Sequence, residues 1–241
     1  MSREFSTLSE YLKDLKNRYF FTLSAFYTYE GLRECCAPNI VGENEVNLNL
    51  EQINRFKNFF LPCKEALRVY FLLELAKLFD ISKESLCINK IVNFTESNIR
   101  NLSLSDFSEF NKDKRFLSEL IENYRSISID DLRNVKSLIS KYKDTIDDLK
   151  TYRDECLAHD DLKKFDIENL NQENIKNLFF IIEKILNLFS RKIDSSTSIY
   201  DYVERLSKDD LNNILDYLRR FEPYRLREIK ELYNEELKGN E

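Results

Sequence analysis

One short stretch, from Tyr152 to Asp161, holds the residue types that phosphate and proton-transfer chemistry require. Arg153 and Asp154 are followed by His159, the only histidine in the 241-residue chain. Arginine presents a planar, permanently charged fork that suits a phosphate group. Histidine titrates near neutral pH and can therefore exchange a proton at that pH. The remaining sequence is typical of a helical scaffold that would position these side chains.

Arg153 stands where the pattern of the preceding helix calls for an apolar residue. It follows Ile146 and Leu149 in phase, so its side chain should point toward a helical core or a second chain. Burying an unpaired guanidinium is costly. We therefore expect Arg153 to meet a carboxylate, a phosphate or the edge of a cleft.

His159 would not share the face of Arg153 on a regular helix, because six residues correspond to a rotation of about 600°. The two side chains could converge only if the helix ended or loosened near Ala158. Asp160 and Asp161 favour an ending there, since acidic side chains are unfavourable at the negative end of a helix dipole.

The composition excludes several classes of protein. With 37 basic and 43 acidic residues the net charge is -6, so nucleic-acid binding would need a local basic patch. One histidine and an odd number of cysteines without a CxxC pair offer no conventional zinc site, and we expect neither a metal nor another cofactor. Reduced cysteines, no apolar signal core and no apolar run of about 20 residues predict a cytoplasmic protein without membrane contact.

Apolar residues recur at helical spacing along most of the chain, which has only 3 Gly and 3 Pro. This predicts an all-α bundle with long antiparallel helices, as residues 1–194, and a C-terminal helical extension, as residues 195–241. Caps are expected at Ser82, Ser128, Asn171 and Ser207. Helices are expected over residues 6–33, 51–79 with a kink at Pro62, 82–94, 112–124, 128 to about 153, 171–189, 200–206 and 208–237. Long connections are expected over residues 34–50 and 95–112, with a linker at 194–198.

A second group of candidates lies in the C-terminal extension. Its densest basic run interleaves cations with aromatic residues, a combination that could bind RNA or a partner. The cations are Arg219, Arg220, Arg225, Arg227 and Lys230, and the aromatic residues are Phe221 and Tyr224. Nearby glutamates dilute the charge, so a solvated helix face is the favoured interpretation. Cys35 and Cys36 are interpreted as packing residues.

The string Arg153-Asp154, four further residues and His159 resembles the signature of the HEPN superfamily of small helical bundles. With Ala158 and Asp161 it resembles the bacterial abortive-infection branch in particular. The apolar stretch of residues 66–80 is similar to the central helix of that branch. The resemblance covers roughly residues 5–193 and leaves the last part of the chain unexplained.

The resemblance implies a metal-independent endoribonuclease of a toxin or antiphage kind, acting as a homodimer whose motif helices form one cleft. RNA cleavage through the 2′-OH needs a base and an acid, and His159 of each chain could supply one role. Arg153 would hold the phosphate and Asp154 would orient Arg153 or His159, while Tyr152 could contact the RNA. An antitoxin or another regulatory partner is left open.

Two other interpretations compete with the nuclease. The chain could be a non-catalytic HEPN-like module that binds a nucleotide or a protein, or a helical interaction protein without cleft chemistry. In the structural alternative, Arg153 pairs with an acidic neighbour and His159 caps a helix C-terminus. A monomer with Arg153 in an internal salt bridge would argue against the nuclease.

Overall fold

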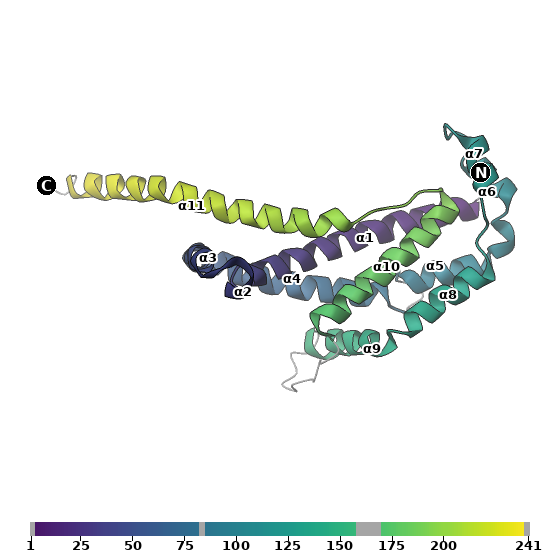
Figure 1. The fold of residues 1–241 in the computed structure, drawn as a ribbon, viewed down its shortest axis with the longest axis horizontal. Coiled ribbons are helices and arrows are strands. Elements are labelled where there is room, and N and C mark those ends of the chain that lie inside the picture. Colours follow the sequence, from purple (N-terminus) through teal and green to yellow (C-terminus); the bar gives the residue numbers. More distant parts are fainter. Residues whose placement is uncertain (1–2, 82–84, 158–169, 239–241) are drawn as a thin grey trace. The chain divides into compact units, whose positions relative to one another are not determined.

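The computed structural model describes residues 3–81, 85–157 and 170–238 (Figure 1). The described residues form helices and no β-strand, which confirms the predicted all-α class. The helices of the first half are α1 (Arg3–Glu34), α2 (Pro38–Val41), α3 (Glu43–Arg55), α4 (Lys57–Leu78), α5 (Ile88–Ser97), the 3₁₀ turn η1 (Ile99–Asn101) and α6 (Leu104–Phe110). The second half contains α7 (Leu117–Asn123), α8 (Ile129–Ser140), α9 (Lys143–Thr151), the π-helix η2 (Tyr152–Leu157), α10 (Gln172–Ile193) and α11 (Asp201–Lys238).

The chain divides into two compact units. Unit 1 comprises Met1–Leu23 and Val69–Tyr200, and unit 2 comprises Ser24–Arg68 and Asp201–Glu241. The end of unit 1 lies near the predicted boundary at residue 194. Residues 24–68, however, group with the C-terminal helix and not with the rest of the predicted bundle.

Unit 1 has a core built from the apolar stripes of its helices. The α10 stripe is buried from Ile175 to Ile193, as its helical spacing predicts. Buried apolar residues of α1, the end of α4, α5, α8 and α9 belong to the same unit, among them Leu8, Leu15, Leu75, Ile91, Leu132 and Leu149. The hydrophobic effect of this burial holds together the helices that present Arg153.

Two of the predicted caps of unit 1 are confirmed. Ser128 and Asp131 form a capping box at the start of α8, and the side chain of Asn171 accepts a hydrogen bond from the backbone N–H of Asn174 at the start of α10. The Lys192 ammonium lies 3.4 Å from an Asp131 carboxylate oxygen, which links α10 to the capping box of α8. Ser82 lies outside the described residues.

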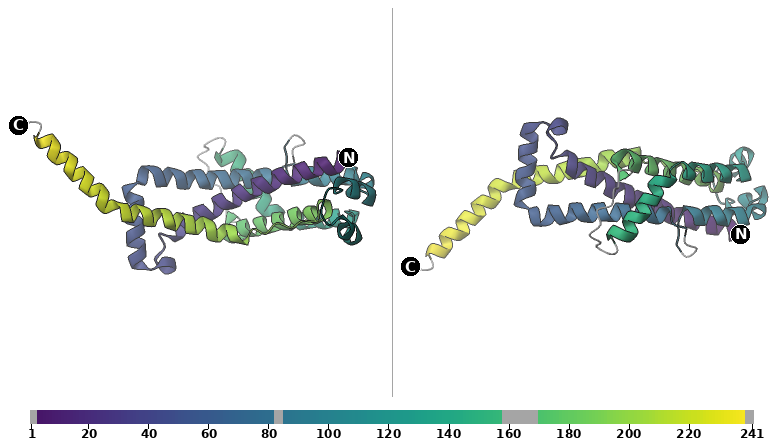
Figure 2. Two further views of the ribbon diagram at one scale, coloured as in Figure 1. Left: turned by 90° about the horizontal axis from the view of Figure 1, so that it is seen from above. Right: turned by 90° about the horizontal axis from the view of Figure 1, so that it is seen from below.

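Unit 2 has a smaller core in which α11 packs against the end of α1 and against α3. Leu32, Cys35, Ile53, Phe60, Leu211 and Leu215 form its buried cluster. A Cβ atom on Gly31 would lie 3.1 Å from a methyl carbon of Leu211, so the glycine permits the close approach of α1 and α11. Helix α3 crosses α11 (Figure 2).

Several predicted boundaries were wrong. The expected loop of residues 34–50 contains α2 and most of α3, and the expected connection of residues 95–112 contains η1 and α6. The helix expected from residue 128 to 153 is interrupted at residues 141–142. The sequence did not reveal this turn, because the apolar stripe continues in phase across it. Helix α11 runs through Ser207, where a cap was expected. A helix break falls at Phe56, while Pro62 lies inside α4.

None of the described helices is both long enough and apolar enough to span a membrane.

Candidate functional site around Arg153

The helix that carries Arg153 changes its geometry one residue before Arg153. The α-helix α9 ends at Thr151 and continues as the π-helix η2 over Tyr152–Leu157. A π-helical turn is rare and is found frequently at functional sites. Convergence of Arg153 and His159 would need the helix to end or loosen near Ala158, and the π-helical turn ends one residue before it. His159 itself lies outside the described residues.

The π-helix sets Arg153 apart from the buried stripe that precedes it. Leu149 is fully buried and Ile146 nearly so, whereas the Arg153 side chain is 23% exposed. The guanidinium therefore lies at the edge of the unit 1 core. The sequence analysis expected Arg153 to meet a carboxylate, a phosphate or the edge of a cleft, and its partners in the structure are carboxylates.

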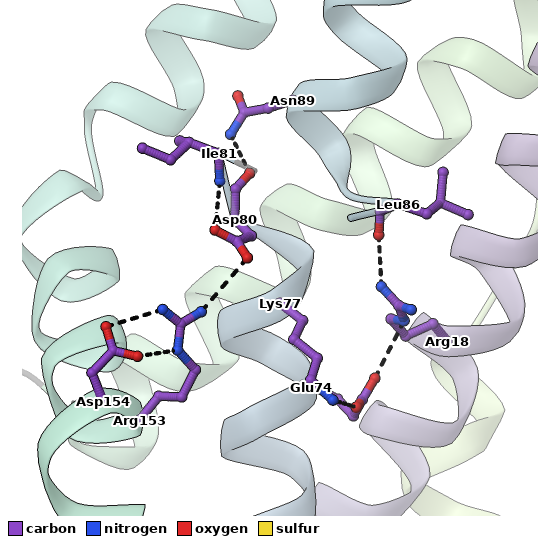
Figure 3. Close-up of polar contacts among 9 residues, drawn as sticks. All are labelled: Arg18, Glu74, Lys77, Asp80, Ile81, Leu86, Asn89, Arg153 and Asp154. Carbon is purple, nitrogen blue, oxygen red and sulfur yellow. Dashed lines mark hydrogen bonds and ion pairs between the residues drawn. The ribbon is translucent and has the colours of Figure 1, made fainter. Parts of the chain in front are cut away.

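Arg153 forms ion pairs with two carboxylates (Figure 3). Its Nε donates to Asp154 Oδ1 at 2.6 Å and its Nη2 donates to Asp154 Oδ2 at 3.1 Å, which makes a bidentate pair. Its Nη1 lies 3.8 Å from Asp80 Oδ2, beyond hydrogen-bonding distance. The predicted role of Asp154 in orienting Arg153 agrees with this geometry, and so does the structural alternative.

Electrostatics fix the protonation of Arg153. The hydrogen bonds with Asp154 raise the pKa of Arg153 above its ordinary value; partial burial opposes this, and the charges of Asp154 and Asp80 add to it. Arg153 is therefore a cation at every accessible pH. Arg153, Asp154 and Asp80 together carry a charge of minus one.

Sequence reasoning did not assign a role to Asp80, although it lies only two residues beyond the end of α4. An acidic residue at the C-terminal end of a helix is unfavourable toward the helix dipole, which is a signal that it has a specific partner. Asp80 Oδ1 accepts a hydrogen bond from the backbone N–H of Ile81 at 2.8 Å, and its carbonyl oxygen accepts one from Asn89 Nδ2 at 2.9 Å. These contacts hold Asp80 opposite Arg153.

A second polar cluster lies beside the first and was also missed (Figure 3). Glu74 Oε2 is 3.2 Å from Arg18 Nε, and Glu74 Oε1 is 2.6 Å from Lys77 Nζ. Arg18 Nη1 also donates to the carbonyl oxygen of Leu86 at 2.6 Å. The signal in the sequence was Glu74 itself, since it interrupts the apolar stripe of α4 in phase with Leu78.

The other predicted RNA-binding residues have different surroundings. Tyr152 is buried, so contact with RNA would require its ring to move. Arg219 bonds Glu45 and Asn49, Arg220 pairs with Asp216 at 2.6 Å, and Arg225 pairs with Glu222 at 2.9 Å. The structure does not bring these three arginines into unit 1, where Arg153 lies.

The interpretation of Cys35 as a packing residue agrees with its surroundings. Burial first, and then the neighbouring Cys36 thiol, raise the pKa of Cys35 to about 12, so its thiol is protonated at neutral pH. Within the described residues, no group of three or more histidine, cysteine, aspartate or glutamate side chains is placed to hold a metal ion.

Residues 5–214 are similar to a known protein family. The profile of one HEPN family, AbiU2, matches this range, which includes Arg153, His159 and the start of α11. Searches of curated proteins and of solved structures gave no match. The match covers most of the 241 residues and extends past the predicted boundary at residue 194. The helical fold of the described residues fits this family, and the chain belongs to the AbiU2 family of HEPN proteins.

Proposed function

We propose that this protein is a metal-independent endoribonuclease of a toxin or antiphage kind, and that it acts as a homodimer. Membership of the AbiU2 family supports the proposal. The observation that carries it is the presentation of Arg153. Its guanidinium is held by Asp154 on a π-helical turn, with Nη1 turned away toward a contact that is too long for a hydrogen bond.

The proposed reaction uses the RNA as its own nucleophile. A 2′-hydroxyl attacks the adjacent phosphorus as a base removes its proton, and an acid protonates the departing 5′-oxygen. The products are a 2′,3′-cyclic phosphate and a free 5′-hydroxyl. Because each chain has one histidine, His159 of one protomer would act as the base and His159 of its partner as the acid.

Arg153 would stabilise the extra negative charge that the phosphate carries in the transition state. Asp154 occupies Nε and Nη2, so Nη1 is the group from which a phosphate oxygen would displace Asp80. The long 3.8 Å contact is the weaker of the two pairs and would yield first. Asp154 would continue to orient the fork.

The ion pairs of Arg153 also support the second candidate function. A guanidinium already paired with two carboxylates is the arrangement expected if Arg153 only stabilises the fold, and each of the two carboxylates repels a phosphate. The protein would then be a non-catalytic module that binds a nucleotide or a protein. The two candidates differ in whether Arg153 and His159 are needed for RNA cleavage.

The deciding experiment incubates the purified protein with total RNA in the presence of a chelator. We expect cleavage that leaves cyclic phosphate ends and that is abolished in His159→Ala and Arg153→Ala. Arg133→Ala is the matched control, because Arg133 also pairs with a nearby aspartate but lies on the exposed face of α8. Growth of cells expressing each variant provides a second measurement that does not depend on the chosen RNA.

The outcomes separate the candidates. Growth arrest and RNA cleavage that disappear in both site variants and persist in Arg133→Ala support the nuclease. If RNA stays intact and the wild-type chain slows growth no more than His159→Ala does, the nuclease proposal is wrong. Sedimentation of the wild-type protein as a monomer under cleaving conditions would contradict the shared cleft.

A further inference from the structure

A cavity of about 320 Å³ lies in unit 1 between α1, α5 and the residue that follows Asp80. Its size is at the lower end of the range of small-molecule sites, about 300–1,000 Å³. It suits one nucleoside better than a larger ligand. We call it the α5 pocket.

One wall of the α5 pocket is a row of short polar side chains. Asn89, Asn93 and Ser97 are four residues apart and therefore share one face of α5. Asn93 and Ser97 are exposed. Each amide offers both a donor and an acceptor, the combination that recognises the edge of a nucleobase.

The lining of the pocket also includes two aromatic rings, Tyr11 from α1 and Phe94 from α5, and one cation, Lys90 from α5. Tyr11 and Phe94 meet edge to face, with ring centroids 5.7 Å apart. The ammonium of Lys90 lies 5.5 Å from the centre of the Tyr11 ring. Aromatic rings stack with unpaired bases and lysine attracts the phosphate backbone, so the pocket combines the features that bind a nucleotide of a single strand.

Asp80 connects the α5 pocket to Arg153. Its carboxylate faces Arg153 Nη1 at 3.8 Å, while its carbonyl oxygen accepts a hydrogen bond from Asn89 in the pocket wall at 2.9 Å. Ile81, which also lines the pocket, donates its backbone N–H to the same carboxylate. Figure 3 shows Asn89 and Ile81 on one side of Asp80 and Arg153 on the other. A phosphate at Arg153 would thus have a base-sized pocket beside it.

We propose that the α5 pocket binds the base of a nucleotide next to the phosphate held by Arg153, so that the protein selects single-stranded RNA by base identity. The proposal rests on the proposed function, because it requires Arg153 to bind a phosphate. Asn93 reads the base edge, the Tyr11 and Phe94 rings contact its face, and Lys90 attracts the backbone.

The test measures binding without cleavage. Short 2′-fluoro oligonucleotides, which lack the attacking hydroxyl, are made of adenosine, cytidine or uridine alone, and their affinities for the full chain are measured by fluorescence anisotropy. We expect the wild-type protein to bind one of them about tenfold more tightly than the weakest. In Asn93→Ala this ratio should fall below about threefold, because the amide that distinguishes the bases is gone.

Two controls isolate the base contact. Asn134→Ala removes an exposed amide from α8, outside the pocket, and should leave the ratio unchanged. Arg153→Ala should weaken the binding of all three oligonucleotides by the same factor, because a phosphate contact is indifferent to the base.

A third variant tests the contact of Lys90 with the RNA backbone. Lys90→Ala should reduce the slope of log affinity against log salt by about 0.7, the value for one phosphate contact on a single strand.

Equal affinity of the wild-type protein for the three oligonucleotides would overturn the proposal, and so would a ratio that survives in Asn93→Ala. Failure of the nuclease has a different signature. If the protein leaves RNA intact but shows a base preference that depends on Asn93, base binding in the α5 pocket is supported and the nuclease proposal is wrong. If the protein cleaves RNA but shows no base preference, the nuclease proposal is supported and base binding in the α5 pocket is wrong.

Discussion

Arg153 in unit 1 and Arg219 in unit 2 are both among the arginines that the sequence singled out, and their surroundings differ. Arg219 Nη2 donates to Glu45 Oε1 at 2.8 Å and to Asn49 Oδ1 at 3.0 Å, so both of its partners lie on another helix, α3. Asn49 is buried and donates in turn to the carbonyl oxygen of Cys35 at 3.0 Å. Arg219 thereby fastens α11 to α3.

Arg153 has its tightest partner next to it in the chain. Asp154 would be close to Arg153 in almost any conformation, so this pair does little to fasten one helix to another. The only link from Arg153 to a distant element among its described contacts is the 3.8 Å approach to Asp80. The comparison predicts that Arg153 contributes less to the stability of the fold than Arg219 does, because its hydrogen bonds to Asp154 link neighbouring residues and its contact with Asp80 is long.

The largest expected effect comes from breaking the Arg219 contact. Arg219→Ala should lower the free energy of unfolding by about 2 kcal/mol, because it leaves Glu45 and the buried Asn49 without their partner. The loss is limited because the buried Nε of Arg219 makes no hydrogen bond within the described residues. Arg153→Ala should cost less than about 1 kcal/mol.

Urea unfolding followed by circular dichroism measures both values. Arg220→Ala is the control on the same helix, since its pair with Asp216 is exposed and should contribute less than about 0.5 kcal/mol. A larger loss of stability from Arg153→Ala than from Arg219→Ala would invert the comparison and make Arg153 the structural arginine.

The second prediction concerns the two carboxylates beside Arg153. Asp80→Asn removes one negative charge, while the new side chain can still accept the hydrogen bond from the Ile81 N–H. The affinity for a short single-stranded oligonucleotide should rise about fivefold, which corresponds to about 1 kcal/mol of relieved repulsion near the surface. Asp130→Asn, which removes the same charge from the exposed end of α8, should have little effect. Unchanged affinity in Asp80→Asn would show that no phosphate approaches Arg153.

Sequence alone predicted the parts of the fold that depend on local rules. The buried stripe of α10 and the capping box of Ser128 both follow from spacing and side-chain chemistry within a few residues. The turn at residues 141–142 could not be predicted, because neither glycine nor proline marks it and the apolar phase is maintained across it.

The candidate site was predictable only in its first half. Arg153 was identified because it breaks an apolar stripe, and Asp154 because it is adjacent. Asp80 and the α5 pocket depend on how α4, α5 and η2 pack, and one sequence does not tell which of such distant residues meet. The grouping of residues 24–68 with α11 was missed for the same reason.

The smallest predicted effect tests what holds unit 1 together if Arg153 does not. Burial alone would raise the pKa of Asp131, but hydrogen bonds from the Ser128 backbone and hydroxyl, together with Lys192, outweigh it and lower the pKa. A lowered pKa in the folded state stabilises the fold above the unfolded pKa, and this contribution is lost as the pH falls through the folded value. Asp131→Asn should therefore lower the free energy of unfolding by about 0.5–1 kcal/mol at neutral pH.

The difference between wild type and Asp131→Asn should shrink as the pH is lowered below the folded pKa of Asp131, where the wild-type carboxylate is protonated and loses its charge-assisted bonds. Urea unfolding at neutral and at acidic pH measures this. A difference that stays constant with pH would mean that the shape of the capping box, and not its charge, secures α8 to α10. In that case the Asp131–Lys192 ion pair would contribute no more to the stability of unit 1 than the Arg153–Asp154 pair does. Apolar packing alone would then hold unit 1 together, whereas Arg219 contributes a polar contact to unit 2.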